Sequence, residues 1–191
     1  MNGELSGKRV AVLVDNYYQE LEVWYPLLRM REAGAEVFTV GPEAGATYKS
    51  KLGYPVKADR AIADVGADDF DALVIPGGWA PDHMRRNPRF ARLIADADQA
   101  AKPIGAICHG AWMLCSAGIL NNRRATAFFS IKDDVVNAGA DYVDEEVVVD
   151  GNLITSRIPD DLPAFCRAMI SAIESASVSS ENSLRDHRAL R

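Results

Sequence analysis

Short apolar runs alternate with amphipathic segments through the first two-thirds of the chain. The runs are rich in β-branched residues and predict buried parallel strands over 8–14, 36–40, 72–75 and 103–107. Apolar residues at helical spacing predict helices over 21–33, 87–101 and 111–117, the second capped by Asn87 with Pro88 behind it. This alternation predicts an α/β fold of right-handed βαβ units around a mostly parallel sheet.

The pattern changes after Gly118. We expect a strand, a short helix begun by Ser130 and Asp133, a hairpin turning at Asp150-Gly151 and a closing helix. Their expected ranges are 125–128, 130–138, 146–156 and 160–174. A further irregular or hairpin excursion is expected over 47–59. The polar residues 175–191 show no periodicity, so we expect a single domain over 1–174 followed by a flexible tail.

Composition narrows the function classes. The 191 residues carry a formal net charge of -6 and no block of Lys or Arg, which argues against nucleic acid and anionic membranes as partners. No apolar run approaches a membrane span, and residues 1–8 lack the apolar region of a signal peptide. The 3 cysteines lack disulfide or CxxC spacing, so we expect a cytoplasmic protein.

The most informative motif is Ala106-Ile107-Cys108-His109-Gly110, where a predicted strand ends at a cysteine and a predicted helix follows. Small residues on both sides of a nucleophile are typical of a nucleophile elbow, because the strand-to-helix turn is too tight for bulky neighbours. The helix N-terminus behind the turn would favour the thiolate. The alternative is an ordinary buried cysteine, and the elbow pattern with its adjacent histidine favours the nucleophile.

Ligand sites of open parallel sheets lie beyond the carboxyl ends of the strands. The loops 15–22, 77–84 and 108–112 should therefore converge. Glu22 would bring a carboxyl group to Cys108, and when protonated it could donate to a thiolate or to a sulfenate. The alternative for Glu22 is a solvated carboxylate at a helix N-terminus.

Gly77 and Gly78 follow a strand directly, and their amides, with that of His109, can form an oxyanion hole. The alternative for the glycine pair is a tight turn. His109 can act as general base, oriented by Asp82 of the same or a neighbouring subunit. Asp82 can equally be a turn-capping residue. The 3 histidines show no ligand spacing, so we expect no metal site.

Taken in order, Leu-Glu-Val-Trp-Tyr-Pro, Val-Ile-Pro-Gly-Gly and Ala-Ile-Cys-His-Gly resemble the ThiJ/PfpI superfamily. Within it, the chain is most similar to the PfpI intracellular protease-like branch. Downstream segments agree with this branch, among them 130–134, 137–140, 146–150, 155–157 and 159–165. The resemblance covers residues 8–174.

The resemblance implies a flavodoxin-like three-layer sandwich and a homo-oligomer, a dimer or a hexamer. It implies Cys108 as nucleophile, Glu22 as its carboxyl partner and His109 beside it. Asp82 stands where relatives offer a carboxylate across a subunit interface. The implied activities need no cofactor: cysteine peptidase, conversion of methylglyoxal to lactate, protein deglycation and stress protection.

Several positions depart from the PfpI pattern. Gln19 replaces an acidic residue, Asp82 a longer glutamate, and Ala111 a proline. Trp79 stands where a polar residue is common, and Phe128 lacks the hydroxyl of a frequent tyrosine. With Trp112 and Phe129 nearby, these changes predict an apolar pocket mouth or, equally, aromatic residues packed in an oligomer interface.

Three functions follow as hypotheses. The first is a cysteine-dependent enzyme acting on small reactive carbonyl compounds. The second is a peptidase with a subunit-shared Cys108–His109–Asp82 site, and the third is a redox sensor or holdase chaperone that uses oxidation of Cys108. A glutaminase domain shares the elbow but needs a late His-x-Glu pair, which this sequence lacks.

Overall fold

Seven strands form the central sheet of the computed structural model, which describes residues 3–189. The strand order is β10-β11-β7-β6-β1-β2-β5. Their bounds are β1 (Arg9–Leu13), β2 (Glu36–Gly41), β5 (Arg60–Ala61), β6 (Ala72–Ile75), β7 (Ile104–Ile107), β10 (Val147–Asp150) and β11 (Leu153–Ser156). Neighbours pair in parallel except β10 and β11, which form the predicted antiparallel hairpin. The predicted mostly parallel sheet is confirmed.

The inner strands are continuously apolar because helices cover both faces of the sheet. Every residue of β6 and β7 is buried, as is every residue of β1 after Arg9. Strands buried on both faces lose the apolar–polar alternation of half-exposed strands. The continuous apolar runs in the sequence are therefore explained by the burial of these inner strands on both faces of the sheet.

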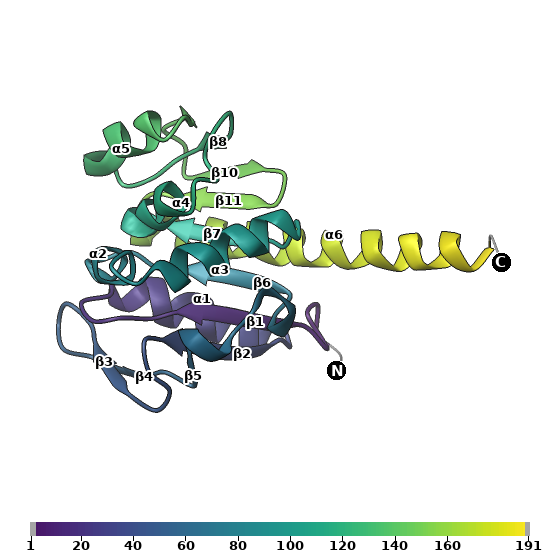
Figure 1. Cartoon of the computed structure of the whole chain (residues 1–191), viewed down its shortest axis with the longest axis horizontal. Coiled ribbons are helices and arrows are strands. Elements are labelled where there is room, and N and C mark those ends of the chain that lie inside the picture. The colour runs from purple at the N-terminus through teal and green to yellow at the C-terminus, as the bar shows by residue number, and fades with distance from the viewer. Residues whose placement is uncertain (1–2, 190–191) are drawn as a thin grey trace.

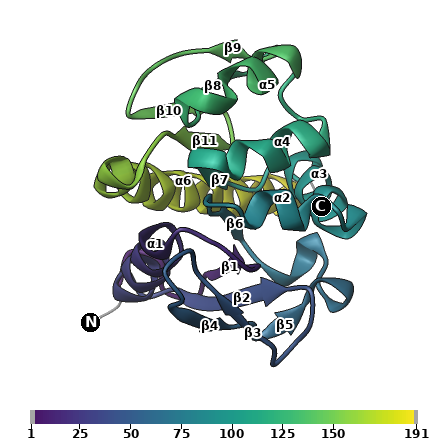
Figure 2. The same cartoon turned by 90° about the vertical axis from the view of Figure 1, so that its left-hand side faces the viewer.

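Two helical layers enclose the sheet. Helices α1 (Glu20–Glu32) and α6 (Leu162–Ala189) pack together on one face. Helices α3 (Pro88–Gln99) and α4 (Ala111–Ala117) pack together on the other, and Figure 2 shows the sheet between the two layers. Gly105 in β7 lets α6 approach closely, since a Cβ there would lie 2.6 Å from Met169 Sδ. The expected three-layer sandwich is confirmed.

The excursion over 47–59 is a hairpin of β3 (Thr47–Lys49) and β4 (Pro55–Lys57). A second small sheet pairs β8 (Arg124–Ala125) with β9 (Asp141–Tyr142). The strand predicted over 125–128 is therefore wrong in its extent. The chain leaves β8 and bends over the elbow, where the Phe128 amide donates to the Cys108 carbonyl at 3.4 Å.

The helix predicted from Ser130 begins two residues later, as α5 (Lys132–Asn137). No side chain caps it, so the predicted Ser130–Asp133 capping start is wrong. A 3-10 turn over Phe129–Ile131 precedes α5 and carries Ser130 toward His109. A contact in the tertiary structure has replaced the local cap.

The closing helix continues past the expected end at residue 174. Figure 1 shows α6 projecting beyond the body of the molecule toward Ala189. The expectation that regular structure ends near Glu174 is therefore wrong; residues 175–189 contain no Gly or Pro to stop a helix. The last two residues of the expected tail lie outside the described residues. Within residues 3–189, no helix combines the length and apolar character needed to cross a membrane.

Candidate active site

The predicted nucleophile elbow is present at Cys108. The residue follows β7 directly and has a φ of 60°, a left-handed conformation rare outside glycine. A 3-10 turn over Cys108–Gly110 leads into α4. A Cβ on Gly110 would lie 2.6 Å from the Ile75 carbonyl oxygen, so the turn requires glycine there. Strain of this kind clusters at functional sites, which makes this turn the candidate site.

The loops that follow β1, β6 and β7 converge as expected. Tyr18 forms a bridge with Gly78, and the Gln19 amide donates to the Gly77 carbonyl at 3.3 Å. A Cβ on Gly77 would lie 2.8 Å from Cys108 Cβ, so the glycine loop passes directly over the elbow. Helices α2 (Ala80–Met84) and α4 lie at the same end of the molecule, which faces the viewer in Figure 2.

Glu22 lies inside the protein rather than in solvent. Its exposed fraction is 0%, which excludes the solvated-carboxylate alternative. Gln19 is the N-cap of α1 and accepts from the Glu22 amide at 2.9 Å, which fixes the start of the helix. The Gly77 amide donates to Glu22 Oε2 at 2.7 Å, and Oε1 has no partner among the described residues.

Glu22 and Cys108 titrate as a coupled pair. Burial raises the pKa of Glu22 to about 7, against the opposing effects of the Gly77 amide and the Cys108 thiol. Burial and then the charge of Glu22 raise the pKa of Cys108 to about 12. The expected thiolate stabilised by a helix N-terminus is therefore corrected, since burial outweighs the helix. The pair holds at most one negative charge near neutral pH.

Fewer backbone amides than expected are available for the proposed oxyanion hole. The Gly77 amide is occupied by Glu22, whereas the amides of Gly78 and His109 point at the Cys108 sulfur and oppose the rise of its pKa. Gly78 has a φ of 74°, and a Cβ there would lie 2.5 Å from the Gln19 amide nitrogen. These two amides are the donors placed to meet negative charge beside the sulfur.

His109 lies between the cysteine and a hydroxyl that the sequence had assigned to a helix cap. Its Nδ1 is 3.3 Å from Cys108 Sγ, and its Nε2 is 3.4 Å from Ser130 Oγ. Burial, and after it the Lys51 ammonium, lower the pKa of His109. The imidazole is therefore neutral at pH 7 and can accept a proton from a thiol.

Aromatic rings surround this imidazole. The ring centroids of Trp79, Trp112 and Phe128 lie 5.8, 5.0 and 5.0 Å from that of His109. Trp79 is 54% exposed. The three predicted pocket-lining residues thus come together around the imidazole that contacts Cys108.

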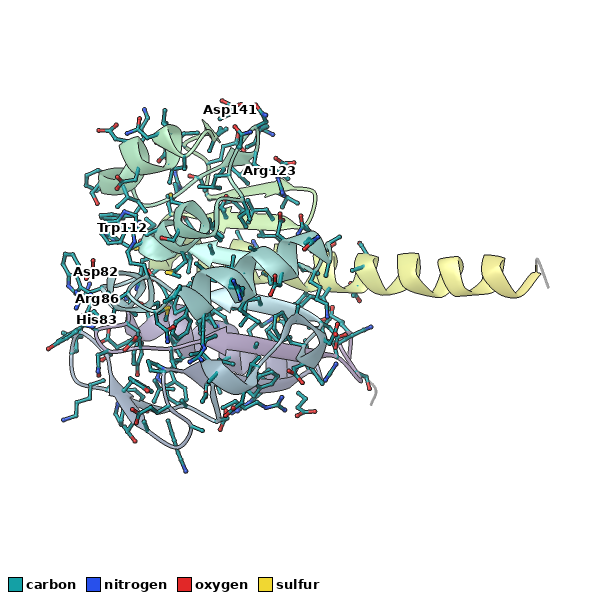
Figure 3. The ribbon with its side chains drawn as sticks, in the orientation of Figure 1. Asp82, His83, Arg86, Trp112, Arg123 and Asp141 are labelled. Atoms are coloured by element: carbon teal, nitrogen blue, oxygen red, sulfur yellow. The ribbon has the colours of Figure 1, made fainter. Side chains whose placement is uncertain are left out.

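Asp82 does not orient His109 within this chain. It lies on α2, and its carboxylate accepts a hydrogen bond from Arg86 one turn later (Figure 3). Figure 3 also shows His83 beside them, and its ring stacks on Tyr17 with centroids 5.5 Å apart. A role for Asp82 across a subunit interface stays a prediction.

Three polar residues near the site were not singled out from the sequence. Ser130 contacts His109, and the Arg85 guanidinium lies 5.8 Å from the Trp112 ring. Lys51, on the β3–β4 turn, acts electrostatically on both Glu22 and His109. Ser130 was expected only as a helix start within the family-like segment 130–134, and no motif marks Lys51 or Arg85; loop conformations bring all three to the elbow. In residues 3–189, no group of three or more His, Cys, Asp or Glu residues is arranged to hold a metal ion.

Comparison with known proteins agrees with this geometry. The DJ-1/PfpI family model matches residues 8–172. Deglycase PfpI of Pyrococcus furiosus is 40% identical over 87% of this chain and 99% of its own length. The putative cysteine protease YraA of Bacillus subtilis is 42% identical over 87% of this chain and 99% of its own.

Among solved structures, a two-domain protein of Anabaena variabilis with DJ-1/ThiJ/PfpI-like and ferritin-like domains matches with a TM-score of 0.84 and 44% identity. The match covers 86% of this chain and 47% of that one. The sandwich is therefore the flavodoxin-like one that the sequence motifs implied. The chain belongs to the DJ-1/PfpI family.

Proposed function

We propose that this protein is a cofactor-free, cysteine-dependent enzyme that converts small reactive carbonyl compounds. One observation carries the proposal, which is the set of groups around the sulfur of the strained Cys108. They are a carboxyl group that can be protonated, a neutral imidazole, and two backbone amides that point at the sulfur. The name of deglycase PfpI supports the same chemistry, because deglycation acts on carbonyl adducts.

With methylglyoxal the reaction proceeds through two covalent adducts of Cys108, a hemithioacetal and a thioester. The Cys108 thiol adds to the aldehyde, and its proton ends on the new hydroxyl of a hemithioacetal. Glu22 or His109 then carries a proton from C1 to C2, and the proton of the C1 hydroxyl passes to the oxygen on C2, which gives a thioester of lactate. Water hydrolyses the thioester, releases lactate and restores the thiol. The amides of Gly78 and His109 point at the sulfur and would be the nearest donors to the oxygen on which negative charge develops.

The protonation states favour carbonyl addition over peptide hydrolysis. A cysteine peptidase uses a thiolate–imidazolium pair, which requires a low thiol pKa and a high histidine pKa. Here burial raises the pKa of Cys108 to about 12 and lowers that of His109. Asp82 is also paired with Arg86 rather than with His109. A reactive aldehyde accepts a neutral thiol with a base beside it, whereas a peptide bond does not.

A non-enzymatic redox role uses the same cysteine in another way. Peroxide would convert the Cys108 thiolate to a sulfenate, to which a protonated Glu22 can donate. Cys115 is the comparison because it is half-buried and therefore no less accessible than the buried Cys108, and burial raises its pKa to about 11. Preferential oxidation of Cys108, measured by intact mass and peptide mapping, together with no turnover of any carbonyl, would favour this alternative.

The test of the enzyme proposal is lactate formation from methylglyoxal. We expect one enantiomer of lactate from the unmodified protein, loss of at least about a hundredfold in rate for Cys108→Ala, and normal turnover for Cys115→Ala. Chiral analysis of the product distinguishes enzymatic from spontaneous conversion. Racemic lactate, or equal rates for the two cysteine variants, would contradict the proposal.

A further inference from the structure

Lys51 lies on the turn of the β3–β4 hairpin, which hydrogen bonds tie to the active site. Its amide donates to the Tyr18 carbonyl at 3.0 Å. Tyr18 forms one bridge with Ser50 and another with Gly78, the glycine whose amide faces Cys108. The Leu52 amide adds a bond of 2.7 Å to Glu20 Oε1 on α1. The position of Lys51 relative to the elbow is therefore fixed by the backbone.

The charge of Lys51 acts on the groups around the sulfur. Burial is the main cause of the raised pKa of Glu22 and of the lowered pKa of His109, and the Lys51 ammonium lowers both. Lys51 itself is exposed, and no ion pair within 4.0 Å involves it in the part of the chain that the structure describes. Lys51 is thus an exposed cation on a turn that hydrogen bonds hold beside the Gly78 loop.

The carboxylates around the mouth are already engaged. Asp82 binds Arg86, and Asp134 accepts from Trp112 Nε1 at 2.8 Å. Glu20 accepts from the Leu52 amide and interacts with Lys51 only through space. Arg85, the other nearby cation, donates to Ser116 Oγ at 3.2 Å. Of these two cations, Lys51 is the one whose charge acts on both Glu22 and His109, whereas the charge of Arg85 acts on Cys115.

We propose that Lys51 binds the anionic end, a carboxylate or a phosphate, of a carbonyl substrate whose aldehyde or ketone adds to Cys108. This inference rests on the proposed function and specifies its substrate class. In the addition, the S–C bond forms as the C=O π bond breaks, and the thiol proton ends on the hydroxyl oxygen. The anionic end does not react; its pairing with the ammonium holds the carbonyl near the sulfur.

The first test does not depend on turnover. Iodoacetate and iodoacetamide alkylate the same thiolate of Cys108 with loss of iodide, but only iodoacetate is negatively charged. Because both rates are proportional to the fraction of Cys108 that is ionised, that fraction cancels in their ratio. The ratio then reports the electrostatic potential at the sulfur. We expect Lys51→Met to lower the iodoacetate-to-iodoacetamide ratio about threefold, the size of effect that one charge screened mainly by water exerts on a charged reagent. Lys51→Arg should restore it, and added salt should reduce the ratio of the unmodified protein.

Lys57→Met is the matched control. Lys57 lies on the same hairpin and is exposed, but it stands in β4 rather than on the turn beside Tyr18, and the lysine whose charge shifts the pKa values of Glu22 and His109, after the larger effect of burial, is Lys51. Its removal lowers the net charge by the same amount. An equal change of the ratio in both variants would mean that only the overall charge matters, and an unchanged ratio in Lys51→Met would overturn the proposal.

The second test identifies the anion. Protection of Cys108 from iodoacetamide is measured with glyoxylate, glyceraldehyde 3-phosphate and uncharged glyceraldehyde. We expect an anionic aldehyde to protect at concentrations at least about threefold lower than glyceraldehyde, and Lys51→Met to abolish that preference. The stronger of the two anions shows whether carboxylate or phosphate is preferred. Equal protection by all three contradicts the inference, whereas a Lys51-dependent preference without methylglyoxal turnover contradicts only the proposed function.

Discussion

Glu22 is a carboxyl group buried with one hydrogen-bond donor and no neighbouring cation within 4.0 Å in the described residues. Ionised carboxyl groups in such surroundings destabilise the folded state, because water solvates them in the unfolded chain. The residue therefore costs stability in return for a proton held beside Cys108. This exchange is typical of functional sites, where local rules of stability are broken.

The cost predicts a pH-dependent gain for Glu22→Gln. The folded pKa of about 7 lies above the ordinary 4.5, so unfolding releases a proton between these values and stability falls as pH rises through that window. Glutamine mimics the protonated carboxyl. We expect the variant to be more stable by about 1–3 kcal/mol above pH 7, with the gain vanishing below pH 4.5. Denaturant unfolding at the two pH values measures it.

Glu20→Gln is a control on the same helix, and its effect on stability at neutral pH should have the opposite sign. Burial alone would raise the pKa of Glu20, but hydrogen bonds from Ser50 and from the Leu52 amide lower it overall. Its ionised form therefore stabilises the fold, and the variant should lose stability at neutral pH and recover it in acid. A stability gain for Glu22→Gln that is the same at both pH values would contradict the assignment of a buried, protonated carboxyl.

The helix caps and strand boundaries that the sequence predicted correctly are those that local residue patterns control. Asn87 caps α3 as expected, accepting from the Arg89 amide at 3.1 Å, and the apolar runs placed the inner strands within a residue or two. The elbow and Glu22 were predictable because sheet topology forces their loops together. The course of residues 125–131 was not, since contacts with Cys108 and His109 decide it.

The Asn87 cap gives a prediction that tests this local logic. Asn87→Ala removes the side-chain acceptor for a free amide at the N-terminus of α3 and should cost about 1 kcal/mol of unfolding free energy. Asn87→Asp keeps an acceptor oxygen and should cost little. The two variants are compared by denaturant unfolding. Equal losses would show that packing of the helix, rather than its cap, sets the cost.

One face of the molecule carries a cluster of exposed apolar side chains. Exposed side chains of α1 and of the β3–β4 turn line a single groove: Leu21, Leu28, Leu52 and Tyr54. Leu52 is 87% exposed. Apolar patches of this kind mark association surfaces. We propose that the protein is a homo-oligomer, a dimer or a hexamer, and that this face is buried between its subunits.

Association through this face predicts a selective effect of charge. Leu28→Glu places a carboxylate in the middle of the groove, where burial against a second copy would leave it unpaired, so it should shift the protein to monomer. Val136→Glu is the control, since Val136 is also exposed but lies on α5. Analytical ultracentrifugation over a range of concentrations measures both. An unmodified protein that stays monomeric throughout would contradict the oligomer, and an oligomer that survives Leu28→Glu would exclude this face. Because Lys51 adjoins Leu52 on the same turn, loss of the interface should also change the iodoacetate-to-iodoacetamide ratio at Cys108, which links the assembly to the active site.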